Sequence, residues 1–122
     1  MTWSGDTAIT PVGAIGSTST DVGGVIDMST AQYTWVQLGV RNDGTVTDQI
    51  LVGAYATLDG VTFDDAPHAE LRLTGTATLA YRPWIIRDAW KFQLKARVIG
   101  PAGTAAGLSD SYTVGGSFRT FS

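Results

Sequence analysis

The chain has 122 residues, of which none is cysteine and one is histidine. Without cysteine there is no disulfide framework and no thiolate ligand for a metal. A single histidine per chain also excludes the zinc sites that need two or three of them. The sequence shows neither a Gly-x-Gly-x-x-Gly stretch nor a Gly-Lys-Ser/Thr stretch, so the usual phosphate-binding loops are missing. Thiol, zinc and nucleotide chemistry are therefore not expected.

Charge and long apolar runs are also scarce. Eight basic and eleven acidic residues give a net charge of -3, which argues against nucleic-acid binding. No apolar run approaches the roughly 20 residues that a membrane-spanning helix needs. Residues 1–6 lack the basic and apolar regions of a secretory signal, and we expect them to be a loose N-terminal segment. Neither nucleic acid nor membrane is expected as a partner.

Strand patterns dominate what is present. Residues 89–99 alternate almost without fault, with Trp90, Phe92, Leu94, Ala96 and Val98 on one face and the polar residues on the other. Because successive side chains of a strand point to opposite sides, this period predicts a half-buried strand in an antiparallel sheet. The fifteen glycines suit tight turns better than helices.

Similar patterns recur along the chain, separated by turn signals. Residues 7–15 contain Pro11 and predict a broken edge strand, while Arg82-Pro83-Trp84 predicts a corner. Gly115-Gly116 predicts a bulge or a close backbone approach. The other predicted strands are residues 22–28, 33–41, 49–58, 61–63, 70–81 with a break at Gly75, and 111–121. The fold class is therefore all-β, a single domain over residues 1–122, built as an antiparallel two-sheet sandwich of about eight strands with jelly-roll topology.

Candidate catalytic residues are few. His68 follows Pro67 in a predicted loop and has no nucleophile elbow to act on, so we interpret it as an ordinary loop residue. Asp59, Asp64 and Asp65 surround a predicted hairpin, where aspartate bonds to nearby backbone, although loop carboxylates also bind Ca²⁺. Asp64 and Glu70 make a glycosidase pair conceivable, but the sequence does not fix their separation. We expect no enzyme activity, no cofactor and no metal.

Two groups of side chains are candidate partner-binding residues. Tyr33 and Trp35 lie on the second face of a strand whose first face is already apolar. Such aromatics form a stacking platform in a carbohydrate-binding module, or they are covered by a loop or another subunit. Lys91, Lys95 and Arg97 form a basic row, which is either a solvated face or a contact for an acidic partner surface.

The order of these features resembles a family of small phage virion proteins, jelly-roll accessory proteins that decorate capsids or form part of head fibres and tails. The matching stretches are Val25-Ile26-Asp27-Met28-Ser29, the strand 33–41, the turn Asn42-Asp43-Gly44-Thr45, the strand and hairpin 54–63, and the strands 91–99 and 111–121. The resemblance implies a non-enzymatic structural protein located in the virion. It also implies binding to major capsid or tail subunits and self-association, with a trimer as the expected form.

Two other function classes stay open. A carbohydrate- or receptor-binding module of a tail protein or a secreted enzyme would use the aromatics of the strand 33–41. A small hydrolase is disfavoured by the shortage of histidine and the lack of cysteine.

Overall fold

The computed structural model describes residues 2–13, 15–16, 18–42, 49–74, 80–99 and 112–122. These residues form eight strands and no helix, so none of them belongs to a helix capable of crossing a membrane. The strands are β1 (Thr7–Val12), β2 (Thr20–Asp27), β3 (Tyr33–Asn42), β4 (Gln49–Thr57), β5 (Ala69–Thr74), β6 (Ala80–Arg87), β7 (Lys91–Ile99) and β8 (Tyr112–Phe121). The turn expected at residues 43–45 lies outside the described residues.

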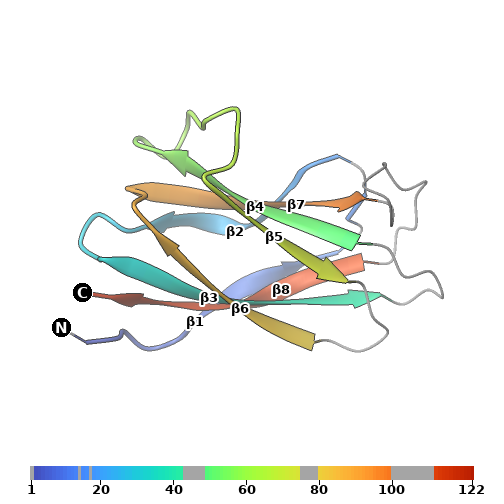
Figure 1. The fold of residues 1–122 in the computed structure, drawn as a ribbon, viewed down its shortest axis with the longest axis horizontal. Coiled ribbons are helices and arrows are strands. Elements are labelled where there is room, and N and C mark those ends of the chain that lie inside the picture. The colour runs from blue at the N-terminus through green and yellow to red at the C-terminus, as the bar shows by residue number, and fades with distance from the viewer. Residues whose placement is uncertain (1, 14, 17, 43–48, 75–79, 100–111) are drawn as a thin grey trace.

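The strands form two four-stranded antiparallel sheets that face each other (Figure 1). Sheet A has the order β1-β8-β3-β6, and sheet B has the order β2-β7-β4-β5. The pairs β1–β8, β2–β7, β3–β6 and β4–β5 are those of one long antiparallel ribbon that has been rolled over on itself. Two further pairings, β3–β8 and β4–β7, join the ribbon into sheets. This is the topology of a jelly roll, and the predicted fold class is confirmed.

The core lies between the sheets because alternate residues of every strand point inward. The central strand β3 contributes Val36 and Leu38 from sheet A, and the central strand β7 contributes Phe92 and Leu94 from sheet B. The expected inward residues of the last strand, Tyr112, Val114 and Phe118, also belong to the core or pack against it. Hydrophobic periodicity therefore identifies most of the core correctly.

Glycine allows one close approach inside sheet A. A Cβ added to Gly116 would run into the carbonyl oxygen of Gln37 on the neighbouring strand. The register of the pairing between β1 and β8 shifts between Ile9 and Val12. The predicted close approach at Gly115-Gly116 is thus confirmed, and β1 is an edge strand as expected.

Five local expectations are wrong. The predicted strand 61–63 does not form, and of its residues only Phe63 pairs, in an isolated bridge with Thr57. Trp90 is 54% exposed because the chain bends there, before β7 begins, so the strand pleat does not direct its side chain inward. Gln93, expected on the solvent face, is only 4% exposed because it covers a bulge in β2. Arg82-Pro83-Trp84 runs straight through β6, an edge strand, where proline is tolerated. The N-terminal segment is partly held, because the amides of Thr2 and Ser4 donate to the carbonyls of Ser122 and Thr120.

Candidate functional site

The outer surface of sheet A carries a cluster of three aromatic rings at the end where both termini lie (Figure 1). Tyr33 of β3 and Phe121 of β8 are cross-strand partners, and their rings stack with centroids 4.9 Å apart. The ring of Trp3 stands edge-on to both, at 5.3 Å from Tyr33 and 5.1 Å from Phe121. Such pairs contribute about 0.5–1.5 kcal/mol beyond the burial of their area.

Arg119 extends the cluster along the sheet. Its guanidinium lies 4.5 Å from the ring centroid of its cross-strand partner Trp35 and 5.1 Å from that of Trp3. The Asp6 carboxylate is 4.0 Å from Arg119 Nε, too far for a hydrogen bond. Ile85 of β6 pairs with Trp35 on its other side and is exposed. We call this surface the aromatic face: Trp3, Tyr33, Trp35, Ile85, Arg119 and Phe121.

The aromatic face does not have the form of a sugar-stacking platform. One face of the Tyr33 ring is taken by Phe121, and one face of the Trp35 ring is taken by Arg119. The sequence left open whether a loop or another subunit covers Tyr33 and Trp35. The structure shows that Trp3, from the N-terminal segment of the same chain, contacts the Tyr33 ring. Trp3 and Ile85 stay exposed beside these partly covered rings, and a surface of aromatic rings, an aliphatic side chain and an arginine has the composition of a protein contact.

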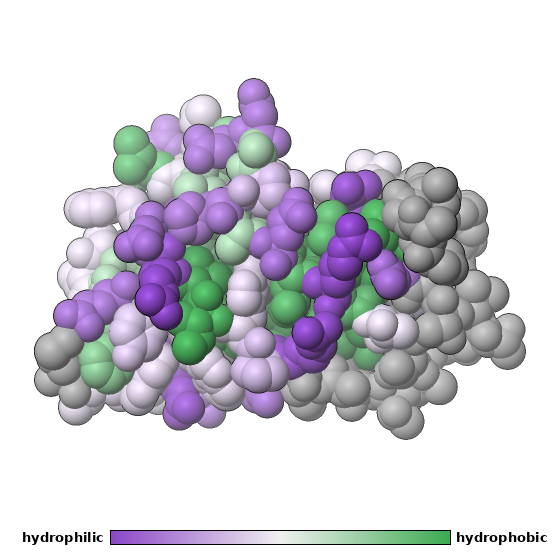
Figure 2. Space-filling model, in the orientation of Figure 1, coloured by the Kyte–Doolittle hydropathy of each residue, from purple (hydrophilic) through white to green (hydrophobic). Residues whose placement is uncertain are grey.

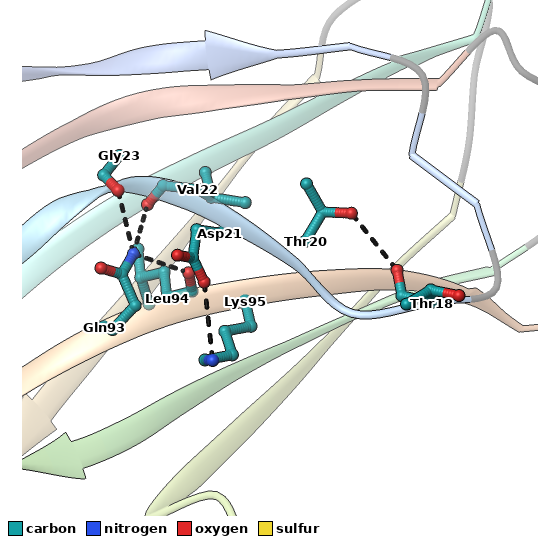
Figure 3. Close-up of polar contacts among 8 residues, drawn as sticks. All are labelled: Thr18, Thr20, Asp21, Val22, Gly23, Gln93, Leu94 and Lys95. Carbon is teal, nitrogen blue, oxygen red and sulfur yellow. Dashed lines mark hydrogen bonds and ion pairs between the residues drawn. The ribbon is translucent and has the colours of Figure 1, made fainter. Parts of the chain in front are cut away.

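The basic row lies on the other outer surface, that of sheet B, so the structure does not bring it together with Tyr33 and Trp35. Lys95 is partly neutralised: its Nζ lies 3.6 Å from an Asp21 carboxylate oxygen (Figure 3) and 5.0 Å from the ring centroid of Phe63. Lys91 is the cross-strand partner of Asp27. Arg97 is exposed. Two of the three basic side chains therefore have an acidic neighbour on β2.

The second candidate surface is a groove at the end of the sandwich where both termini lie (Figure 1). The β2–β3, β4–β5 and β6–β7 connections surround a groove of about 1000 Å³. We call it the terminal groove, and its lining residues are Met28, Ser29, Ala31, Ala56, Thr57, Leu58, Asp59, Thr62, Phe63, Asp64, Asp88, Ala89 and Trp90. On the β4–β5 connection, which borders the groove, Leu58 and Val61 are 78% and 80% exposed. Figure 2 shows hydrophilic and hydrophobic atoms mixed over the protruding part of the molecule. Sequence periodicity cannot reveal this groove because it is assembled from three separate connections.

Asp59 organises one wall of the groove. Its Oδ1 accepts hydrogen bonds from the backbone N–H groups of Val61 and Thr62, both at 2.8 Å. Gly60, between Asp59 and Val61, has a φ of 82°. The bonds from Thr62 and Val61 lower the pKa of the Asp59 carboxyl below its ordinary 3.8, because they stabilise the ionised form. The predicted turn chemistry is confirmed for this residue.

We expect the Asp59 turn to weaken in acid. Because the folded pKa is lowered, the stabilisation by Asp59 is fully present above pH 3.8 and is lost as the pH falls through the folded value. An Asp59→Asn variant keeps an acceptor but does not titrate. It should be less stable than the wild type at neutral pH, and the difference should shrink in acid when thermal unfolding is followed against pH. A titration midpoint of the Asp59 carboxyl carbon at or above 3.8, measured by NMR, would contradict this account.

His68 has a structural contact. Its Nε2 lies 2.6 Å from the carbonyl oxygen of Arg87, and because a carbonyl only accepts, Nε2 carries the proton in this contact. The bond joins the β4–β5 connection to β6 and so links the two sheets. No group of three or more His, Cys, Asp or Glu side chains placed to hold a metal occurs among the described residues.

The structure therefore offers two candidate surfaces, the aromatic face and the terminal groove. Of the residues predicted from sequence, Tyr33 and Trp35 belong to the first, and Asp59 and Asp64 line the second. Comparison with protein-family models, with curated proteins and with solved structures finds no match for this chain.

Proposed function

We propose that this protein is a non-enzymatic structural subunit of a bacteriophage virion, acting as a capsid decoration or head-fibre component. In this proposal the protein associates with itself, as a trimer, and with other virion subunits through the aromatic face. The aromatic face is the observation that carries the proposal. The resemblance of the sequence to small virion proteins supports the location, and viral capsid proteins are one class that uses the jelly roll.

The physical support comes from how the aromatic face is built. Its residues sit mainly on β3 and β8, the two central strands of sheet A, so each of these strands is held by a paired strand on both sides. Tyr33 and Trp35 are half-buried within the chain, while Ile85 and Trp3 are exposed beside them. Aromatic and arginine side chains that are already ordered lose little entropy on binding, which is why they dominate interface energetics.

Replacing Tyr33 and Trp35 together with serine should abolish self-association and attachment. Light scattering should show a smaller particle than the wild type, and the variant should be lost from purified virions. A second variant, Ile85→Lys, places a charge on the exposed part of the face without removing a half-buried ring, and should have the same effect. The matched control is Glu70→Ser, an exposed change on β5 of sheet B outside both groups of candidate partner-binding residues, which should assemble normally.

Thermal unfolding of each variant separates loss of the interface from loss of the fold. A folded double variant that assembles and attaches like the wild type would refute the proposal. So would the absence of the protein from purified virions.

A further inference from the structure

The terminal groove has the chemistry of a ligand site that the aromatic face does not explain. Its lining combines apolar side chains, among them the buried Met28, with the exposed side chain of Trp90. Three aspartates line it, and its described lining includes no Lys, Arg or His. The aspartates that line the groove repel an anionic ligand, whereas a ligand with hydroxyl donors and an apolar surface would meet complementary groups.

The backbone that carries Trp90 is held by a hydrogen bond and by the packing of its neighbour. Met28 N donates to the carbonyl oxygen of Trp90 at 2.8 Å, and the neighbouring Ala89 packs against the core. Asp88 has a φ of 62°, a left-handed conformation uncommon for residues other than glycine. Outliers of this kind gather at binding sites when the surrounding structure enforces them. The connection thus contributes a carboxylate, Asp88, and an indole, Trp90, to the lining of the same groove.

Two acceptors in the groove are unused. Asp59 accepts its hydrogen bonds within the turn, but the side chains of Asp64 and Asp88 have no hydrogen bond or ion pair with any described residue. Each carboxylate oxygen is therefore available to a donor from a ligand.

The backbone around the groove, in contrast, is largely committed. The amides of Met28, Ala31 and Asp64 donate to carbonyls within the chain, and Thr57 forms a bridge with Phe63. The amides of Val61 and Thr62 donate to Asp59. A peptide that binds by adding a strand needs free backbone groups along an edge. The terminal groove presents mainly side chains to a ligand, so it does not suit a peptide that binds in this way.

We infer that the terminal groove binds a neutral oligosaccharide. One pyranose ring lays its apolar C–H face on Trp90, and its hydroxyls donate to the carboxylates of Asp64 and Asp88. A sugar combines these two surfaces in one molecule, whereas an extended peptide would leave its own backbone unpaired. This gives the protein a recognition function beyond the proposed assembly role and at a surface separate from the aromatic face.

The test is an NMR titration of the full chain with neutral hexasaccharides of glucose, mannose and N-acetylglucosamine at millimolar concentration. At least one should shift the indole N–H signal of Trp90 and the amide signals of residues 28–31, 58–64 and 88–90, while the indole signal of Trp35 stays in place. Absence of a shift with all three sugars would overturn the inference, as would shifts centred on Tyr33 and Trp35. Shifts of the groove signals by hexalysine and not by any sugar would also overturn it, in favour of a cationic partner.

Variants then assign the contact. Trp90→Ala and the pair Asp64→Asn with Asp88→Asn should each weaken binding by at least about tenfold. Trp3→Ala, which removes an exposed tryptophan from the aromatic face, is the matched control and should bind like the wild type. Because the ring of Trp90 is exposed, its variant should fold, which the dispersion of the NMR spectrum checks directly. Undiminished binding by folded Trp90→Ala would refute the site, whatever the outcome of the assembly experiments.

Discussion

Replacing Phe92 with alanine should lower the free energy of unfolding by about 3–5 kcal/mol. The side chain is fully buried at 0% exposure, on a strand that is central in sheet B. Its neighbours across the sheet are Ile26 of β2 and Ala56 of β4. Truncation removes the transfer free energy of the ring and leaves a cavity that the two sheets cannot close without sliding. A domain of ordinary stability, about 5–15 kcal/mol, would lose a large part of it.

Urea denaturation of the variant and the wild type measures this effect directly. The matched control is Trp90→Ala, a larger truncation only two positions away, which should cost less than about 1 kcal/mol because the ring is 54% exposed. A loss at Phe92 below that of Trp90 would mean that β7 presents its other face to the core.

The contrast between Phe92 and Trp90 shows where reasoning from periodicity succeeds and where it stops. Alternation correctly assigns Phe92, Leu94 and Val98 to the core because the pleat of a strand directs its side chains. The same alternation fails at Trp90, since the strand has not yet begun there. A sequence gives the period of a strand more reliably than its first residue.

Proline and glycine show a second limit. Pro83 predicts a corner, but it lies within β6, an edge strand of sheet A. Which strand forms an edge depends on how all the strands pair, and local sequence does not show this. Gly116 is correctly predicted to permit a close approach. The atom that approaches it, the carbonyl oxygen of Gln37, lies far away in the sequence and is fixed by the β3–β8 register.

In the aromatic face, too, some residues are predictable from the local sequence and others are brought in by strand pairing. Tyr33 and Trp35 are predictable as an aromatic second face because they are two residues apart on one strand. Phe121 and Arg119 join them only through cross-strand register, and Trp3 joins through the pairing of the N-terminal segment with β8. Lys91, Lys95 and Arg97 are predictable as a row, but their separation from the aromatic face required the assignment of strands to sheets.

Gln93 is the residue for which the period misled most, and its burial has a specific cause. It occupies an outward position of β7, opposite a shift in the register of β2 between Val22 and Ile26, where Gly23 has a φ of 73°. The shift leaves carbonyl oxygens without partners from a regular ladder. The amide Nε2 of Gln93 lies 2.9 Å from the carbonyl oxygen of Gly23, 3.0 Å from that of Leu94 and 3.4 Å from that of Val22 (Figure 3).

Replacing Gln93 with leucine should therefore destabilise the protein by about 2–3 kcal/mol, although the new side chain is apolar and of similar size. Each buried carbonyl left without a donor costs about 1–3 kcal/mol, and the amide has two protons to share among its three acceptors. The matched control, Gln37→Leu, changes the same residue type at a half-buried outward position of the central strand β3, and should change stability by less than about 0.5 kcal/mol.

A Gln93→Glu variant gives the sharper test because it keeps the shape and reverses the polarity. An ionised carboxylate would face the same carbonyl oxygens with no donor between them, so it should be more destabilising than leucine at neutral pH. Protonation restores one O–H donor, so this variant alone should regain stability relative to Gln93→Leu as the pH is lowered. Urea unfolding at neutral and mildly acidic pH measures both differences. Equal stabilities of the leucine and glutamate variants at both pH values would show that the β2 bulge does not depend on the donated hydrogen bonds.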